Sequence, residues 1–493
     1  MSGAYSPTRE EFLELARSHT LVPVWREVLG DLETPVGAYR KLGAESNSFL
    51  LESVEHGERW GRYSFIGVDP FLSMASRGGA IEWGGDPPPG AADAPDPLVA
   101  LERAVSAYRA PVLPGLPPLH GGAVGYIGYD AVHYVERLTK TKPDDLGFPE
   151  MWMLFTGRLL VFDHLRQRLT VISNVVIGDD PARQYDEAVA AGEALVGRLA
   201  ATPTHSRAVS PPLDATPGDL RSTMTPEEYE RAVESAKDRI GDGEIFQVVP
   251  SQRFEAECGA DPFDVYRVLR LINPSPYMTF LRFPELSLVC SSPEPFLKVV
   301  GDEVVSRPIA GTRPRGASPD EDAKLAEELL ADEKERAEHV MLVDLARNDL
   351  GRVCEPGTVR VEDLMQVERY SHVMHIVSEV RGRLAEGRNA FDAFKAAFPA
   401  GTVSGAPKIR AMQIIEELEP VRRGPYAGAI GYFDFSGNID TCITLRTALI
   451  AGGKAYVQAG AGIVADSVPE TEEQETRSKA RALLAAVKAA EEL

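Results

Sequence analysis

The chain is poor in cysteine, with only Cys258, Cys290, Cys354 and Cys442 among 493 residues. These four residues are far apart in the sequence, and none of them forms a C-x-x-C pair. A disulfide framework and a zinc cluster both need closely spaced cysteines, so the pattern argues against either. Scarce, scattered cysteine is typical of proteins in a reducing compartment. We therefore expect a cytoplasmic protein.

Long apolar runs and excess positive charge are also missing. No stretch approaches the roughly 18 apolar residues that a membrane-spanning helix needs, and the first twenty residues contain no apolar signal-peptide core. The chain has 52 Lys and Arg against 74 Asp and Glu, which gives a net charge of -22. Nucleic acids and anionic membranes are bound by basic patches, so we expect neither as a partner. A small anionic ligand would need local positive charge or a metal ion.

The sequence contains no nucleotide-binding motif but many strand-like runs. No G-x-G-x-x-G opens a helix after a strand, and no P-loop is present. Runs of β-branched and aromatic residues fall in groups between predicted helices and do not alternate strictly with them. This order predicts an α+β fold with large, mostly antiparallel sheets packed with helices. The runs are 245–254, 277–283, 286–292, 426–435, 440–450 and 454–464.

Two stretches rich in Pro, Gly and Ala divide the first half of the chain. Residues 84–97 predict a loop that links strands within one domain. Residues 201–219 follow a helical pattern and are the better boundary. We therefore expect an N-terminal region over 1–205 that is part of a two-sheet core, and a second region over 220–493.

A predicted helix over 332–353 carries Glu335 and Glu338 three residues apart, where like charges face each other. Asp332 can cap this helix, Glu335 can complete a capping box, and Glu338 can then be an ordinary surface charge. Like charges at this spacing cost only about 0.2–0.5 kcal/mol, so the pair alone decides nothing. The predicted helical face comprises Ala337, Val340, Met341, Asp344, Leu345 and Asn348.

A second predicted helix repeats the spacing with Glu472 and Glu475, and Lys479 follows one turn later. Glu475 and Lys479 can form an ordinary i, i+4 ion pair on a wet face. Two pairs with one spacing also suggest four carboxylates that face each other across a cleft and bind a hard divalent cation. Mg²⁺ fits that set better than zinc because it prefers oxygen ligands. Periodicity does not tell whether the two helices meet.

Several long segments resemble the chorismate-utilising enzymes and, among them, anthranilate synthase component I. The match runs in order over the last part of the chain, and two N-terminal segments resemble the same component. The segments are "FLLESVEHGERWGRYSFIG" (Phe49 to Gly67), "GGAVGYIGYD" (Gly121 to Asp130), "PIAGTRPRG" (Pro308 to Gly316), "LVDLARNDLGRV" (Leu342 to Val353), "FPAGTVSGAPKIRAM" (Phe398 to Met412), "GAIGYFDFSGNIDTCITLRTA" (Gly428 to Ala448) and "QAGAGIVADSVPETEEQETRSKA" (Gln458 to Ala480).

The resemblance implies how the site binds chorismate. Glu338 and Glu475 would be the Mg²⁺ ligands, with Glu335 and Glu472 beside them, and the metal would hold the ring carboxylate of chorismate. The other implied substrate-binding residues are Arg446 and Tyr426 for the enolpyruvyl carboxylate, the backbone N–H groups of Gly460, Ala461 and Gly462, the hydroxyls of Thr312 and Thr402, and Lys479 near the anion. Each also has an ordinary structural explanation, such as a surface ion pair for Arg446, core packing for Tyr426, a strand bend for the glycines and turn chemistry for the threonines.

The implied reaction has two steps. Ammonia adds at C2 of chorismate as the C4 hydroxyl leaves, and pyruvate is then eliminated. Glu335 is the candidate acid for the hydroxyl, and His375 is the candidate for proton transfer in the elimination, although a lone histidine on a strand is more often structural. Gln247 occupies the position of the lysine that water-using relatives employ as a base. Ala310 stands where aminodeoxychorismate synthases commonly have a nucleophilic lysine.

Two partners besides chorismate follow from the resemblance. No nucleophilic-cysteine signature of a glutaminase is present, so ammonia would come from a separate glutamine amidotransferase subunit, component II, or from solution. L-Tryptophan would inhibit by binding Glu52 and Ser53 together with Pro276, Tyr277 and Met278, unless these segments are ordinary packing. The alternative functions are a 2-amino-2-deoxyisochorismate synthase of secondary metabolism, an aminodeoxychorismate synthase component I, and a silent regulatory subunit that binds tryptophan.

Overall fold

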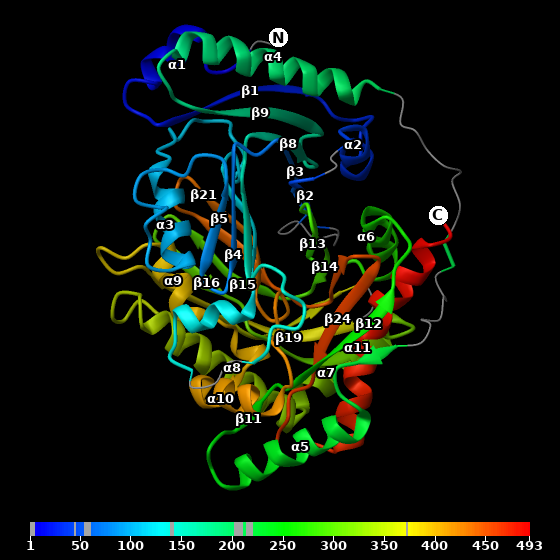
Figure 1. The fold of residues 1–493 in the computed structure, drawn as a ribbon. Helices are drawn as coiled ribbons and strands as arrows, with labels where there is room; N and C mark the ends of the chain where they lie inside the picture. Colours follow the sequence, from blue (N-terminus) through cyan, green and yellow to red (C-terminus); the bar gives the residue numbers. More distant parts are fainter. Residues whose placement is uncertain are drawn as a thin grey trace.

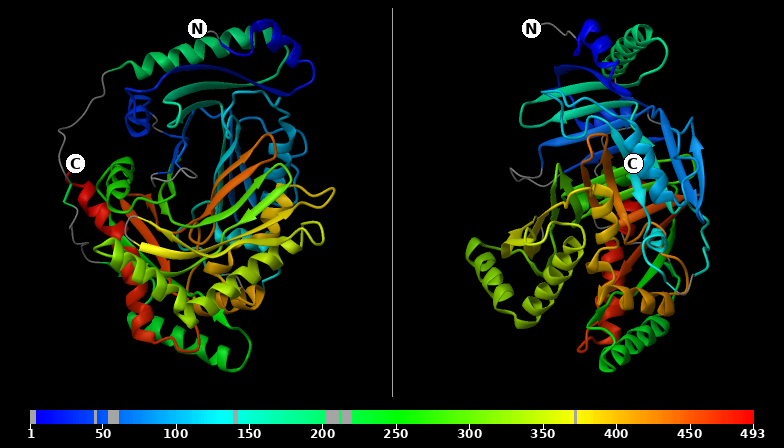
Figure 2. Two further views of the ribbon diagram at one scale, coloured as in Figure 1. Left: turned by 180° about the vertical axis from the view of Figure 1, so that it is seen from behind. Right: turned by 90° about the vertical axis from the view of Figure 1, so that its left-hand side faces the viewer.

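The computed structural model describes residues 5–43, 46–53, 61–138, 142–201, 211–212, 220–370 and 373–493. Two large β-sheets form the centre, and helices cover their outer sides (Figure 1). Figure 2 shows the same arrangement from behind and from the side. Every pairing between described strands is antiparallel, as the sequence predicts for this α+β fold.

The first sheet has eleven strands drawn from both halves of the chain. In spatial order they are β1 (Leu21–Leu29), β9 (Arg168–Val176), β8 (Arg158–Asp163), β3 (Tyr63–Val68), β2 (Ser48–Glu52), β13 (Tyr277–Arg282), β14 (Ser287–Ser292), β23 (Thr447–Ala451), β24 (Lys454–Gly460), β12 (Ser251–Glu257) and β10 (Arg221–Ser222).

The second sheet is also mixed in sequence origin. Its strands are β17 (Ile309–Pro314), β19 (Val373–Arg383), β16 (Glu303–Ser306), β15 (Pro295–Val300), β22 (Ile439–Ile443), β21 (Ala429–Asp434), β6 (Gly122–Ile127), β7 (Met151–Phe155), β4 (Leu72–Arg77) and β5 (Ala80–Gly84), with β18 (Arg360–Arg369) paired to β19. A short ladder joins β11 (Gln247–Val248) to β20 (Gly405–Ala406).

The two predicted regions, 1–205 and 220–493, therefore share both sheets. Strand β2 pairs with β13 in the first sheet, and β6 pairs with β21 in the second. Most of the predicted boundary segment, namely 202–210 and 213–219, lies outside the described residues, as do residues 54–60 within the first motif segment. The loop over 85–96 connects strand β5 to a helix, so the prediction that it links two strands is wrong.

Helices cover both sheets. Helices α1 (Arg9–Leu15) and α4 (Pro181–Leu199) lie along β1 and β9 at the top of Figure 1. The other helices are α2 (Pro35–Lys41), α3 (Pro97–Ala107), α5 (Pro226–Gly241), α6 (Pro262–Ile272), α7 (Pro319–Ala331), α8 (Glu333–Gly351), α9 (Ala390–Ala397), α10 (Lys408–Leu418) and α11 (Pro469–Ala490), with short 3₁₀ turns at Tyr129–Tyr134 and Gly401–Val403. No helix in the described ranges has the length and apolar character to cross a membrane.

Helix α8 begins where the sequence predicts it, but the residues on its buried face differ from the predicted ones. The Asp332 carboxylate accepts hydrogen bonds from the N–H groups of Lys334 and Glu335, which caps the helix. The side chain of Val340 is 47% exposed, so the predicted face is wrong. The face that packs inward carries polar residues, which hid it from a count of apolar positions. It consists of His339, Leu342, Val343, Ala346, Asp349 and Leu350.

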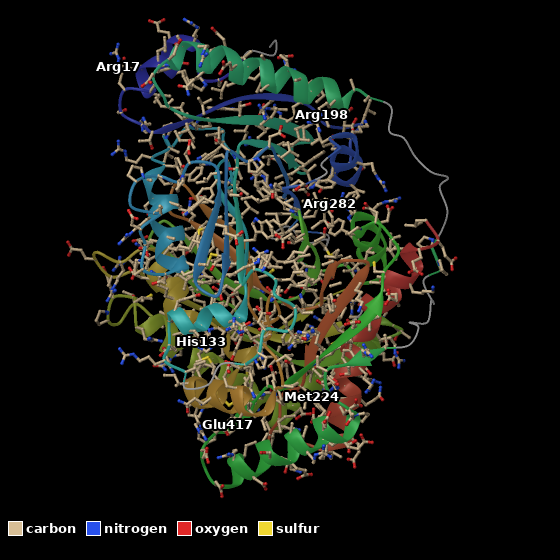
Figure 3. All side chains as sticks on the ribbon, viewed as in Figure 1. Arg17, His133, Arg198, Met224, Arg282 and Glu417 are labelled. Carbon is tan, nitrogen blue, oxygen red and sulfur yellow. The ribbon has the colours of Figure 1, made fainter. Side chains whose placement is uncertain are left out.

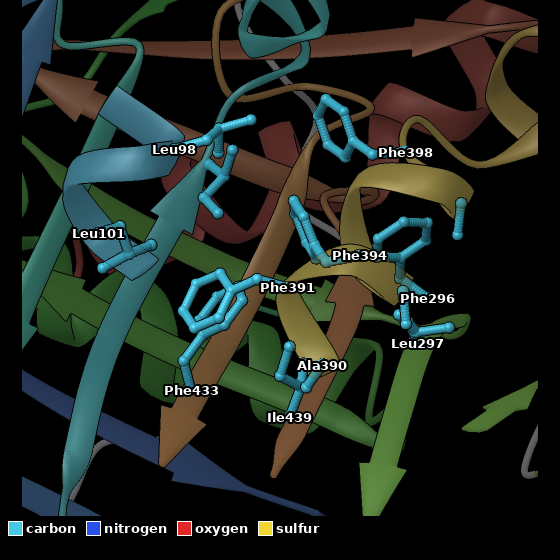
Figure 4. Packing of buried hydrophobic residues seen from close by; sticks show 14 of the residues in the cluster. Leu98, Leu101, Phe296, Leu297, Ala390, Phe391, Phe394, Phe398, Phe433 and Ile439 are labelled. Atoms are coloured by element: carbon cyan, nitrogen blue, oxygen red, sulfur yellow. The ribbon is translucent and has the colours of Figure 1, made fainter. Parts of the chain in front are cut away.

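A cluster of phenylalanines anchors α9 on the second sheet (Figure 4). Phe391 stacks on Phe433 of β21 with ring centroids 4.9 Å apart, and Phe394 meets Phe296 of β15 edge to face at 5.4 Å. Burying such rings is worth more than their area alone because their quadrupoles favour these geometries. This packing holds in place the turn after α9 that carries Thr402. All four cysteines are buried and none forms a disulfide, as predicted.

Candidate active site

One cavity of about 590 Å³ gathers residues from nearly the whole second half of the chain. It is lined by residues of α8, α11, β17, β19, β24 and the turns beside them. Of the residues predicted for catalysis, substrate and metal, all but Ala461 line it: Gln247, Thr312, Glu335, Glu338, His375, Thr402, Tyr426, Arg446, Gly460, Gly462, Glu472, Glu475 and Lys479. Residues far apart in sequence thus form one site.

The two acidic pairs face the same space from different helices. Burial raises the pKa of Glu338, and the charges of Glu335 on its own helix and Glu475 on α11 raise it further. Burial also raises the pKa of Glu472, again with a contribution from Glu475. Because both pairs line the same cavity, α8 and α11 face each other across it. Within the described ranges, however, no three His, Cys, Asp or Glu side chains stand close enough together to form a ready-made metal site.

Each of three acids has a direct polar partner. Gln247 Nε2 donates to Glu338 Oε1 at 2.8 Å, and Arg313 Nη1 donates to Glu335 Oε1 at 3.1 Å. Lys479 Nζ lies 2.7 Å from Glu475 Oε1 and also donates to the carbonyl of Gly460 at 2.9 Å. Lys479 therefore combines the ordinary helix ion pair with a place on the cavity wall. The ion pair is half exposed, so it adds little stability.

His375 lies on β19 directly opposite Thr312 of β17. Its Nδ1 is 2.9 Å from the carbonyl oxygen of Gly311 and 3.1 Å from Thr312 Oγ1. A carbonyl only accepts hydrogen bonds, so we assign the proton of the neutral ring to Nδ1 and the lone pair to Nε2. Burial lowers the pKa of His375, and the nearby Arg446 adds to this. The imidazole is therefore neutral near pH 7 and suited to accept a proton.

Arg446 and Tyr426 are twenty positions apart in the sequence, and both line the cavity. Arg446 sits between β22 and β23 with a φ of 44°, a left-handed backbone that is uncommon outside glycine and often found at functional sites. The predicted strand run 440–450 is split at this point. Burial lowers the pKa of Arg446, whereas Glu294 opposes the change. Burial raises the pKa of Tyr426 to about 12, so its hydroxyl keeps its proton.

Two glycines on the cavity wall leave little room for a side chain. A Cβ at Gly460 would stand 2.7 Å from the carbonyl oxygen of Pro250 and 2.9 Å from the Tyr426 hydroxyl. A Cβ at Gly462 would stand 2.8 Å from Gln247 Nε2. The N–H of Ala461 donates to the Pro250 carbonyl and its side chain is buried in the core, so this N–H is already used. Of the predicted backbone donors, the structure places Gly460 and Gly462 at the cavity.

Glu294 is a cavity residue that the sequence analysis missed. It lies between β14 and β15 in the segment Pro293–Pro295. Burial raises the pKa of its carboxyl to about 7, while Thr402, Lys479 and Arg446 partly oppose the rise. Its side chain keeps some accessible surface because it borders the cavity, yet protein atoms surround it. The only sequence signal was an acid held between two prolines after an apolar strand, which is weak evidence.

The residues predicted to bind tryptophan form a separate group. Met278 of β13 pairs with Glu52 of β2 in the first sheet. The Glu52 carboxylate already accepts a hydrogen bond from the Tyr266 hydroxyl at 2.6 Å and from Arg270 at 3.2 Å. Ser53 Oγ is buried, and no partner for it is found among the described residues. Pro276 and Tyr277 adjoin them, and the Tyr277 hydroxyl donates to Asp440 of β22, the strand that leads to Arg446.

Comparison with known proteins identifies the family of this chain. A model of the chorismate binding enzyme family matches residues 47–485. The chain belongs to this family. It is 49% identical to anthranilate synthase component 1 of Mycolicibacterium smegmatis over 99% of this chain and 94% of that protein. It is 46% identical to the protein of the same name from Acetivibrio thermocellus over 99% of this chain and all of the other.

Solved structures agree with this assignment. Anthranilate synthase component I from Streptococcus pneumoniae is 37% identical to this chain and superposes on it with a TM-score of 0.76. The superposition covers 93% of this chain and 99% of the other. The menaquinone-specific isochorismate synthase from Escherichia coli has a TM-score of 0.69 at 19% identity, with 97% and 98% of the two chains covered, and shares the fold.

Proposed function

We propose that this chain is the large subunit of an anthranilate synthase. This lyase converts chorismate into anthranilate and pyruvate, and ammonia is the amino donor. The observation that carries the proposal is the convergence of two acidic pairs, Arg446, Tyr426 and His375 on one cavity. The chain is similar over nearly its whole length to proteins named anthranilate synthase component 1, which supports this product over those of other family members.

The acidic end of the cavity suits Mg²⁺. Glu338 is buried against Glu335 and Glu475, whose charges raise its pKa, and a divalent cation would relieve this repulsion. Glu338 and Glu475 would be ligands, with Glu335 and Glu472 beside them; oxygen-only donors fit Mg²⁺. When bound, the ion would neutralise the ring carboxylate of chorismate. Arg446, the Tyr426 hydroxyl and the N–H groups near Gly460 would hold the enolpyruvyl carboxylate.

The first step needs a proton donor for the departing C4 hydroxyl. Glu294 fits this role because burial raises its pKa to about 7, so that much of it is protonated near neutral pH. The carboxylate of Glu335, the candidate from sequence, is already engaged by a hydrogen bond from Arg313. We therefore assign the proton transfer to Glu294 and keep Glu335 for the acidic end of the site.

The second step removes the C2 proton and breaks the C3–O bond to the enolpyruvyl group. The neutral His375 can take that proton at Nε2 while the C–H electrons complete the aromatic ring, and can then give a proton to the departing enol of pyruvate. Thr312 and the Gly311 carbonyl fix the orientation of the imidazole. Thr402, which also lines the cavity, would hydrogen-bond the substrate.

Two residues favour ammonia over other nucleophiles. Gln247 donates to Glu338 at the cavity wall and has no basic group to activate water. Ala310 also lines the cavity and offers no amine for a covalent intermediate. Ammonia would come from a separate glutamine amidotransferase subunit, and L-tryptophan would inhibit at Glu52, Ser53, Pro276, Tyr277 and Met278. An indole needs apolar walls, which Pro276 and Met278 can supply.

We predict that Glu338→Gln and Glu475→Gln each lower Mg²⁺-dependent turnover by roughly 100-fold or more, because an amide cannot replace a charged ligand. Glu333→Gln and Glu470→Gln are matched controls, since both acids are exposed on the same two helices outside the cavity. Turnover is followed by anthranilate fluorescence during a Mg²⁺ titration. Near-normal activity of either cavity variant at limiting Mg²⁺ would show that the metal assignment is wrong.

At a fixed concentration of free ammonia, chorismate consumption should fall as pH rises above about 7, because Glu294 then loses its proton. Glu294→Gln should remove this alkaline limb and slow consumption by roughly 10²–10⁴-fold, as expected for loss of a general acid. Glu335→Gln serves as the comparison. The assignment to Glu294 fails if its variant keeps the limb and the Glu335 variant loses it.

His375→Met should separate the two steps. We expect this variant to consume chorismate and ammonia but to accumulate a non-aromatic aminated intermediate, with much less anthranilate and pyruvate, because elimination lacks its base. The parent should release anthranilate and pyruvate in equal amounts. Chromatography with absorbance detection distinguishes the products. Accumulation of the intermediate by the parent would instead support a 2-amino-2-deoxyisochorismate synthase, and joint loss of both steps in the variant would assign His375 an earlier role.

Ser53→Phe should relieve inhibition by tryptophan and leave the uninhibited rate nearly unchanged. The Ser53 hydroxyl is buried beside the Glu52–Met278 pairing, so a phenyl ring would fill the space an indole needs. Ser53→Ala is the control that removes the hydroxyl without adding bulk. Inhibition curves are measured for all three proteins. Equal tryptophan sensitivity in the Phe variant and the parent would refute this site.

A further inference from the structure

One buried ion pair lies behind the cavity at the end of helix α10. Glu419 caps the helix, and Arg423 follows four residues later; each residue is 3% exposed. Arg423 Nε lies 3.0 Å from Glu419 Oε2, and Nη2 lies 2.5 Å from Oε1. This two-point geometry is the strongest that an arginine and a carboxylate make. None of the roles assigned above involves either residue.

The remaining donors of Arg423 hold the backbone of two site segments. Nη1 donates to the carbonyl of Val403 at 2.8 Å, and Nη2 donates to the carbonyl of Val249 at 2.6 Å. Val403 directly follows Thr402, and Val249 lies two residues after Gln247. The guanidinium carbon also lies 5.6 Å from the ring centroid of Tyr426, within reach of a cation–π contact. Three cavity residues from separate segments are thus tied to one side chain.

Glu419 extends the network to a fourth segment. Its Oε1 accepts hydrogen bonds from the N–H and the Oγ of Ser251, both at 2.8 Å. Ser251 Oγ in turn accepts from Gln458 Nε2 at 2.8 Å. Gln458 lies on β24, lines the cavity and precedes Gly460 by two residues. The pair therefore connects β11, the turn at Thr402, Tyr426 and β24.

Stability alone is a poor reason for such a pair. Removing two charges from water costs several kcal/mol each, and well-packed apolar side chains often serve stability as well or better. Burial by itself would lower the pKa of Arg423, but the Glu419 carboxylate raises it overall, so the guanidinium stays charged. What apolar side chains cannot supply is the set of directed hydrogen bonds to carbonyls and an amide.

We propose that the Glu419–Arg423 ion pair is the positioning device for the end of the cavity that receives the enolpyruvyl group of chorismate. It acts through Gln247, Thr402, Tyr426 and Gln458, which line the cavity, and neither member touches the substrate. The proposal rests on the function proposed above. In this proposal the ion pair, and not the sheet pairing alone, fixes how the segments that carry these four residues are placed relative to one another.

The test uses Arg423→Lys and Ser251→Ala in the full-length chain. Lysine keeps the charge but cannot reach both carbonyls and the carboxylate. Ser251→Ala removes the hydroxyl that bridges Glu419 to Gln458 and keeps the hydrogen bond from the Ser251 N–H to Glu419. Loss of a hydrogen bond to a charged group corresponds to about tenfold or more, so we expect kcat/KM for chorismate to fall by at least that factor in each variant, with a raised KM. Thermal unfolding and circular dichroism report whether each variant is folded.

Glu417→Gln is the matched control. Glu417 lies on the same helix (Figure 3), pairs with Arg239 at 3.1 Å and is not among the residues that line the cavity. It should lower the melting temperature modestly and leave both kinetic constants at parental values. If Arg423→Lys does not fold, Ser251→Ala decides. Kinetic constants of the folded variants within twofold of the parent would overturn the positioning role. If the parent forms no anthranilate from chorismate and ammonium, the proposed function itself fails.

Discussion

The carboxylates of Glu338 and Glu475 repel each other across the cavity, and the protein is built to hold them there. Helix α8 packs on β17 and β19 of the second sheet, whereas α11 packs on β24 of the first sheet and on α5 and α6. The distance between the two acidic pairs is therefore set by how the sheets pack. A buried cluster that includes Phe49, Tyr126 and Leu288 joins the two sheets. Apolar packing thus supplies the free energy that keeps like charges together.

The cavity has the charge pattern that a substrate with two carboxylates requires. Four acids line it, which repel an anion unless their charge is offset, and Arg446 on the same cavity offers fixed positive charge. Glu294 and His375 both have shifted pKa values, raised for the acid and lowered for the base, and burial is the main cause of each. A raised pKa keeps a carboxyl protonated and a lowered pKa keeps an imidazole neutral. At the same pH, the first can therefore donate a proton and the second can accept one.

Spacing and motif resemblance predicted much of this site. Periodicity and capping residues predicted the two helices, and the motifs predicted residues that line one cavity. The cation shared by the i, i+3 glutamates stays a prediction. Sequence could not give the phase of α8, because its inward face carries His339 and Asp349. It also missed Glu294, whose chemistry comes from burial and not from any local pattern. The Glu419–Arg423 pair was invisible for the same reason, since an acid and an arginine four residues apart usually lie on a wet surface.

The mixed origin of both sheets has a consequence for the order in which the chain folds. Strand β2 needs β13 as a neighbour, and β6 (Gly122–Ile127) needs β21 (Ala429–Asp434), which lies far later in the sequence. During synthesis the first half of the chain therefore emerges with strand edges that lack their native neighbours. Pairings over such long sequence separations form slowly, and open edges invite association with other chains. The native protein can form only after β21 to β24 have left the ribosome, and until then both sheets of the nascent chain are incomplete.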